Sequence, residues 1–295
     1  MPETADVLAS AACDTPAEAP PVMIVGVMNR CGTNFLADVL RCHRDLELPT
    51  VAPEDYLLRY ADRLDAYAHN TTQHWAARPP GDTDHAKRLL ARIGESLLDH
   101  LREQITPGKR LPLKTPRAIG LERAARMLPT AKLVLMIRDG RDVVESAARS
   151  FPYAGHGEWA RRWADGARRI RDFTERQAPD EAGRRWVLVS YRELFEDPVS
   201  VARRCIAFVD ADENALDVEA IRALGVRGSS TARGGKAAVH FSPVERPEDF
   251  RPLGRWTNWS IARRLQIELR LGRELRQLGY TRDASWVWHP ARAAA

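Results

Sequence analysis

The chain has 295 residues, enough for one large α/β domain or two small ones, and its 44% hydrophobic and 29% charged residues are typical of a protein that buries a full core. The formal net charge of +5 suits an anionic ligand, although a solvated arginine-rich surface explains it more simply. No apolar stretch approaches the ~20 residues that span a bilayer, which argues against a membrane protein.

Residues 1–21 contain Ala, Pro and acidic residues but no basic segment followed by an apolar core. We therefore expect a disordered leader and not a signal peptide. The cysteines show neither CxxC pairing nor metal-ligand spacing with histidine; they are Cys13, Cys31, Cys42 and Cys205. This pattern predicts thiols in a reducing cytoplasm and no metal site.

Three short apolar runs with β-branched residues predict strands at Val22–Val27, Leu133–Ile137 and Trp186–Ser190. A helical pattern follows each run, and Asp197-Pro198 is a helix-start signal after the third. Strand–helix alternation of this kind predicts an α/β fold with a central parallel sheet flanked by helices on both faces.

Apolar residues at helical spacing predict further helices between Leu90 and Ile105, between Trp159 and Phe173, and from about Ser260 to Leu278. Residues 66–85 and 225–252 are rich in turn formers and predict loops, which in a compact domain are usually lids, binding loops or disordered segments.

The domain organisation follows from these elements. We expect a single domain over residues 22–295, with helical and loop insertions at 51–112 and 225–252.

The turn after the first strand, Arg30-Cys31-Gly32-Thr33-Asn34, predicts an anion site. Backbone N–H groups at a helix N-terminus attract an anion, and glycine allows close approach. The Thr33 hydroxyl can cap the helix or bind a phosphate oxygen, and the Arg30 guanidinium presents donors that suit phosphate or sulfonate oxygens. An ordinary helix cap explains the turn as well.

Comparison with an ATP-binding loop narrows the choice of anion. Such a loop needs GxxxxGK[ST], but no lysine lies between Gly26 and Thr33. The second predicted strand also leads into Arg138 and not into an aspartate that could hold Mg²⁺. A kinase or ATPase is therefore disfavoured on chemical grounds.

Arg138 follows the second strand, and Ser146 lies eight residues later in the next helix. Ligands of open α/β sheets bind at the carboxyl ends of the strands, so these two residues are candidates for a second phosphate site. Alternatively, Arg138 pairs with Asp139 or Asp142 at the surface.

Three further segments carry candidate binding residues. Lys114 lies between an apolar run and Pro116, a restricted position. Tyr191 comes at the end of the third predicted strand. Gly254-Arg255-Trp256 precedes the last predicted helix, where a cation and an aromatic ring could close over a nucleotide.

These five segments together resemble the sulfotransferase family, whose enzymes use 3′-phosphoadenosine 5′-phosphosulfate (PAPS). Residues 30–34 resemble the family's 5′-phosphosulfate loop, and Arg138 with Ser146 resembles its 3′-phosphate motif. Tyr191–Leu194 and Gly254–Trp256 match later family segments in the same order. Over residues 22 to about 280, the resemblance implies the P-loop-containing nucleotide-binding fold of sulfotransferases.

The likeness is strongest to the branch of tyrosylprotein sulfotransferases and their bacterial relatives. In that branch a catalytic Glu and a Lys-x-Pro follow the phosphosulfate loop, which implies roles for Glu54 and Lys114. Because the segment before Glu54 is slightly longer here, Asp55 is an alternative. Cys31 and Asn34 replace the family's Ser and second Thr.

The resemblance implies in-line transfer of a sulfuryl group from PAPS to a hydroxyl or amine of a small acceptor such as a natural product. The implied catalytic residues are the base Glu54 and the cations Lys114 and Arg30. The implied donor-binding residues are Arg30, Cys31, Gly32, Thr33, Asn34, Arg138, Ser146, Tyr191, Arg255 and Trp256. Trp256 and Tyr191 would flank the adenosine, and adenosine 3′,5′-bisphosphate (PAP) would be the product.

Several alternatives stay open. His240 could be the base, as histidine is in cytosolic members of the family. An ATP-dependent small-molecule kinase and a non-catalytic basic protein that binds nucleic acid are the rival functions, although the aromatic residues lie mostly at core spacing. We expect a bacterial cytoplasmic enzyme with no metal, nucleic-acid or membrane partner, and a homodimer is left open.

Overall fold

The fold is built on a four-stranded sheet in the order β2-β1-β3-β4, with all neighbouring strands parallel. The strands are β1 (Val22–Gly26), β2 (Pro112–Thr115), β3 (Lys132–Ile137) and β4 (Trp186–Ser190). The computed structural model describes residues 19–50, 54–75, 84–176, 185–226, 245, 247–248 and 250–290.

The predicted strands are confirmed to within a residue, and β2 was missed. This strand has only four residues, begins with Pro112 and contains the charged Lys114. It lies at the edge of the sheet, where short strands and proline are tolerated, and pairs with β1 so that Lys114 is opposite Ile24. The apolar pattern of β2 is too short for the sequence alone to distinguish a strand from a loop.

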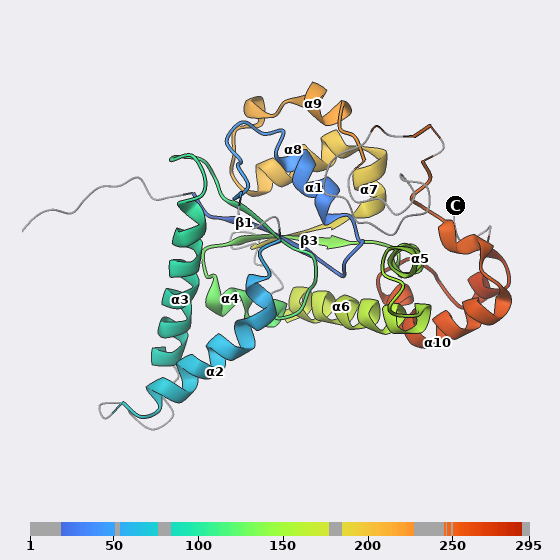
Figure 1. The fold of residues 1–295 in the computed structure, drawn as a ribbon, viewed down its shortest axis with the longest axis horizontal. Coiled ribbons are helices and arrows are strands. Elements are labelled where there is room, and N and C mark those ends of the chain that lie inside the picture. Colours follow the sequence, from blue (N-terminus) through green and yellow to red (C-terminus); the bar gives the residue numbers. More distant parts are fainter. Residues whose placement is uncertain are drawn as a thin grey trace, which may run out of the picture.

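Helices cover both faces of the sheet, as predicted. Figure 1 shows α1, α7, α8 and α9 above it and α6 below it, with α5 and α10 beside α6. The helices are α1 (Thr33–Leu40), α2 (Ala61–Thr72), α3 (Asp84–Arg102), α4 (Ala124–Met127), α5 (Gly140–Ser150), α6 (His156–Arg176), α7 (Tyr191–Glu196), α8 (Pro198–Phe208), α9 (Val218–Arg222) and α10 (Ile261–Gln277).

The prediction of a loop over residues 66–85 is wrong at both ends of this range, where the chain is helical. Helix α2 continues to Thr72 and α3 begins at Asp84, while residues 76–83 lie outside the described chain. Asn70-Thr71-Thr72 reads as a loop because these are weak helix formers. In the structure Thr72 is fully buried and its hydroxyl donates to the Ala68 carbonyl, so tertiary packing outweighs propensity. Most of the predicted loop at 225–252 and of the leader falls outside the described residues.

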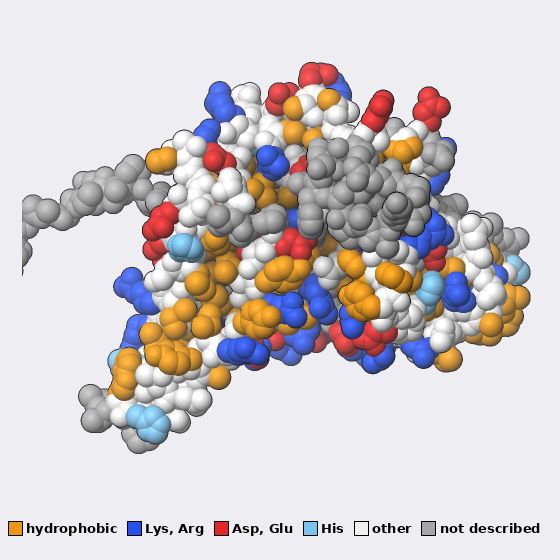
Figure 2. Space-filling view, viewed as in Figure 1, with side chains coloured by type: hydrophobic (Ala, Val, Ile, Leu, Met, Phe, Trp, Pro, Cys, Tyr) orange, Lys and Arg blue, Asp and Glu red, His pale blue; other side chains and the backbone are white. Residues whose placement is uncertain are grey.

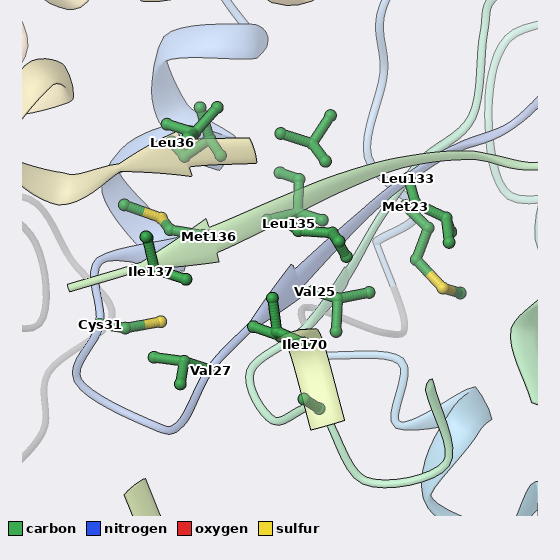
Figure 3. Packing of buried hydrophobic residues seen from close by; sticks show 14 of the residues in the cluster. Met23, Val25, Val27, Cys31, Leu36, Leu133, Leu135, Met136, Ile137 and Ile170 are labelled. Atoms are coloured by element: carbon green, nitrogen blue, oxygen red, sulfur yellow. The ribbon is translucent and has the colours of Figure 1, made fainter. Parts of the chain in front are cut away.

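The core lies on both sides of β1 and β3. Figure 3 shows Leu36 of α1 against one face of these strands and Ile170 of α6 against the other. Val25 and Leu135, on the two strands, are completely buried. Because helices cover both faces, these strands are continuous apolar runs without alternation.

The order of the strands determines where a ligand can bind. From β1 the chain goes to β2 on one side, and then returns across β1 to β3 on the other. The carboxyl end of β1 is therefore the switch point of the sheet, where open α/β folds bind ligands. The turn at residues 27–32 occupies this position.

Glu145 of α5 joins this side of the fold to the C-terminal region. Its carboxylate accepts hydrogen bonds from Trp259 (2.6 Å), Arg149 (2.6 Å) and His156 (3.3 Å). Burial alone would raise the pKa of Glu145, but these hydrogen bonds outweigh it and lower the pKa to about 2, from an ordinary 4.5.

We expect Glu145→Gln to lower the free energy of unfolding by about 1–3 kcal/mol at pH 7. Because the folded pKa is depressed, the stabilisation by Glu145 is present above pH 4.5 and is lost as the pH falls towards 2. Urea unfolding at pH 7 and at pH 3 measures this: the difference between wild type and variant should shrink at pH 3. Glu219→Gln, which removes an exposed partner of Arg222, is the control. A pH-independent difference would contradict the prediction.

Candidate active site

A cavity of about 740 Å³ lies at the carboxyl ends of the strands. Its wall includes residues from most of the predicted motifs, namely Arg30, Gly32, Thr33, Asn34, Glu54, Arg138, Ser146, Tyr191 and Arg255. The predicted site residues Lys114, Cys31 and Trp256 are not part of this wall. Parallel strands bring the motifs together, because all their carboxyl ends meet at one edge.

The turn between β1 and α1 requires its glycine. Gly32 has φ +107°, and a Cβ placed there would lie 2.3 Å from the ring of Tyr191. Gly32 has no side chain that could cap α1. Arg30 also has positive φ (75°), a strained conformation that is common at functional sites. The first amides of α1 are therefore available to an anion.

Three arginines converge beside this turn. Burial, then Arg138 and Arg255, lower the pKa of Arg30 to about 10. Burial and Arg138 lower the pKa of Arg255 as well. Because like charges this close repel one another, an anion bound beside the three arginines would relieve their repulsion.

Hydrogen bonds connect two of these arginines to the motifs around them. Arg138 donates to the carbonyl oxygens of Arg30 (2.9 Å) and Pro252 (2.5 Å), and its guanidinium lies 4.1 Å from the centre of the Tyr191 ring. Its Nε is buried and has no hydrogen-bond partner among the residues that the structure describes. Arg30 donates to Ser146 (3.2 Å), so the two predicted phosphate motifs are in direct contact.

Among the described residues no salt bridge joins Arg138 to a neighbouring aspartate, although its charge acts on Asp142 and opposes the rise in the pKa of that carboxyl. Asp139 forms a salt bridge with Arg141 at 2.6 Å. Asp142 accepts hydrogen bonds from the backbone N–H groups of residues 254 (3.2 Å) and 255 (3.0 Å), and burial raises its pKa to about 6. Sequence reasoning missed that Asp142 holds the Gly-Arg-Trp segment in place.

Lys114 lies beneath the cavity wall. It is 3% exposed, its ammonium donates to the side-chain oxygen of Asn34, and it lies 3.6 Å from a carboxylate oxygen of Glu54. Asn34, which replaces a family threonine, thus connects the turn to β2. Lys114, Asn34 and Glu54 come from three segments and form one cluster.

Glu54, and not Asp55, faces the cavity. Glu54 accepts a 2.5 Å hydrogen bond from the Tyr56 hydroxyl, and burial together with this bond raises the pKa of Tyr56 to about 12. Asp55 accepts from the Thr115 hydroxyl and from the backbone N–H of Leu57 (2.9 Å). Burial raises the pKa of Asp55, and its hydrogen bond from Thr115 connects this segment to β2. The third predicted base, His240, lies outside the described residues.

Trp256 and Cys31 face the core. Trp256 is 1% exposed, lies 3.9 Å from the guanidinium of the buried Arg141 and contacts Trp286 edge-on. Trp256 does not line the cavity, so its position does not fit the expected role of stacking on the adenosine. Cys31 is completely buried, and burial raises the pKa of its thiol. Phe250 lines the cavity beside Arg255.

No group of three or more His, Cys, Asp or Glu side chains in the described part of the chain could hold a metal ion. No helix within the described ranges is both long enough and apolar enough to cross a bilayer.

Comparison with known proteins identifies the family. The sulfotransferase family matches residues 20–214, so the chain belongs to the sulfotransferase family. This match includes the turn, Glu54, Lys114, Arg138 and Tyr191. It confirms the predicted enzyme class, a sulfotransferase. A search of curated protein sequences found no match.

Solved structures of sulfotransferases are similar to this chain. The sulfotransferase domain of the olefin synthase of Synechococcus PCC 7002 is 18% identical, with 83% of this chain and 90% of that chain covered and a TM-score of 0.52. A mouse sulfotransferase complexed with PAP is 12% identical over 94% and 90%, with a TM-score of 0.48. The sulfotransferase from Alicyclobacillus acidocaldarius is 19% identical over 66% and 82%, with a TM-score of 0.42.

Proposed function

We propose that this enzyme transfers the sulfuryl group of PAPS to a hydroxyl or amine of a small acceptor, with Glu54 as the base. The observation that carries the proposal is that Glu54 lines the same cavity as the three converging arginines Arg30, Arg138 and Arg255. A carboxylate and an anion site in one cavity are what a base-assisted transfer from an anionic donor requires.

Residues at the carboxyl ends of the strands would bind the donor. Arg30 and the amides of Gly32 and Thr33 at the N-terminus of α1 are suited to the 5′-phosphosulfate. Arg138, whose buried Nε has no partner within the described part of the chain, and Ser146 are suited to the 3′-phosphate. We leave Trp256 and Cys31 out of the proposed donor site, because both face the core.

The chemical step is an in-line displacement at sulfur. The acceptor oxygen or nitrogen attacks the sulfur of PAPS and forms a new bond, while the bond from sulfur to the bridging oxygen of the 5′-phosphate breaks. Its electron pair leaves on PAP, and the acceptor proton passes to Glu54. Arg30 and Lys114 neutralise charge on the departing phosphate and the sulfuryl oxygens. Positioning of the two substrates supplies the rest of the acceleration.

The branch of the family and the size of the acceptor belong to the same proposal. The Glu54 and Lys114 cluster supports a relationship to the tyrosylprotein-sulfotransferase branch. A small acceptor, such as a natural product in the bacterial cytoplasm, fits a cavity of about 740 Å³ that must also hold the donor.

Ligand binding tests the donor assignment. PAP should raise the melting temperature of the wild-type protein, whereas ATP with Mg²⁺ and single-stranded DNA should not. Arg138→Met should weaken PAP binding by about 10–100-fold, because it removes charge-assisted hydrogen bonds of about 1.5–3 kcal/mol. Arg263→Met, an exposed arginine on α10, is the matched control. Stabilisation by ATP with Mg²⁺ alone would favour a kinase, and equal PAP affinity in Arg138→Met would refute the 3′-phosphate assignment.

A further inference from the structure

A second group of arginines lines the cavity: Arg59, Arg117 and Arg162. Arg59 lies in the short helix Leu57–Tyr60, Arg117 follows β2 directly after Pro116, and Arg162 is on α6. These segments are distant in the sequence. Their convergence on one cavity is a property of the fold, and none of them belongs to a motif used for the donor.

This second arginine group is separate from the donor arginines. Burial, then Arg162 and Arg59, lower the pKa of Arg117, whereas the cations that act on Arg30 belong to the donor group. Tyr56 connects the second group to the base. Its hydroxyl donates to Glu54, and its ring centre lies 5.8 Å from the Arg59 guanidinium. Only the Tyr56 side chain would thus separate an anion bound by Arg59 from the carboxylate of Glu54.

The charges of this group are poorly compensated within the described chain. Arg162 pairs with Glu158 at 2.7 Å, but Arg59 contacts the rings of Tyr56 and Tyr60. Arg117 is half-buried and has no carboxylate within salt-bridge distance among the described residues. Arg59 is exposed, whereas Arg117 and Arg162 are partly buried, and like charges gathered in this way repel one another unless an anion neutralises them.

Aromatic side chains form the adjoining wall. Phe151, Tyr153 and Trp159 line the cavity and pack on one another, with ring centres 5.5 to 6.1 Å apart. The guanidinium of Arg162 lies 4.7 Å from the centre of the Trp159 ring. Figure 2 shows hydrophobic and cationic side chains interleaved on the face that carries α2 and α6. Such a wall suits a flat apolar body with an acidic substituent.

We propose that Arg59, Arg117 and Arg162 form an anion subsite for the acceptor, which is therefore an acidic molecule with an aromatic body. The carboxylate or phosphate of the acceptor binds the guanidiniums, its ring lies on the aromatic wall, and its nucleophilic group reaches Glu54. This inference rests on the proposed function, because it assigns the second half of the same cavity. It also explains why cations outside the donor motifs line that half.

Matched probes test the subsite in the PAP-saturated protein. The probes are aromatic hydroxy acids paired with their amides, and phosphorylated phenols paired with their neutral parent phenols. Calorimetry of the PAP-saturated protein gives their affinities, and PAPS turnover without added PAP gives kcat/KM for the probes that carry a free hydroxyl. Acidic members should bind about 10–100-fold more tightly than neutral members, the range for charge-assisted hydrogen bonds. The ranking of carboxylates against phosphates identifies the preferred acid.

Two variants locate the effect. Arg117→Met should abolish most of the preference for acidic probes while leaving PAP affinity unchanged. Arg161→Met removes the same charge from α6 at an exposed position outside the cavity, and should retain the preference. Equal binding of acidic and neutral probes by wild type, or no binding of any acidic probe, would overturn the subsite while PAP binding stood. Failure of wild type to bind PAP would instead refute the proposed function.

Discussion

Glu54→Gln is expected to lower turnover with PAPS by about 10²–10⁴-fold while leaving PAP affinity within about twofold. The amide has nearly the same shape and can still accept the hydrogen bond from Tyr56, but it cannot take the proton of the acceptor. Single-turnover formation of PAP, measured with saturating acceptor, reports the loss directly. The Michaelis constants should change little, because the donor motifs are untouched.

Asp55→Asn is the matched control for this prediction. The Asp55 oxygen that accepts from Thr115 and Leu57 can be kept in an asparagine, so the turn should survive and activity should stay near that of wild type. If Asp55→Asn lost turnover and Glu54→Gln kept it, the base would be Asp55. If both retained full activity, the base would lie elsewhere, with His240 as the remaining sequence candidate.

Much of the fold and of the donor side of the site was predictable because the signals are local. The strand at Trp186–Ser190 lies where the apolar run predicts it, and Asp197 caps the next helix by accepting from the Ser200 N–H. Once the sheet is parallel, the ends of its strands must meet at one edge. The positions of Arg138 and Gly32 in one cavity then follow from the fold class alone.

What the sequence did not reveal depends on contacts between distant segments. Trp256 beside an arginine looks like a nucleotide-stacking residue, but its partner is the buried Arg141 on α5. The anchoring of residues 254–255 by Asp142 spans more than one hundred positions along the chain. Arg117 carries a weak local signal, since it follows Pro116 at a strand end, but nothing local says that Arg162 lies beside it.

Gly32→Ala is expected to weaken PAP binding by at least ~10-fold and to destabilise the protein more than the same change at another left-handed glycine. Two costs combine at this position. Alanine at φ +107° carries a penalty of about 1–2 kcal/mol, and its Cβ would overlap the ring of Tyr191. Relief of the overlap must move the Tyr191 ring or the turn, which costs about 1–3 kcal/mol and displaces donor-binding groups. Urea unfolding and PAP titration measure the two effects.

Gly108→Ala separates these costs. Gly108 also has positive φ (+83°), but a Cβ there meets nothing within 4 Å, so this variant should show the backbone penalty alone and normal PAP affinity. The double variant Gly32→Ala with Tyr191→Leu should recover part of the stability that Gly32→Ala loses, because the ring that causes the overlap is gone. The prediction would be contradicted if Gly32→Ala and Gly108→Ala lost equal stability and both retained PAP affinity. PAP binding would then not depend on how this turn packs against the Tyr191 ring.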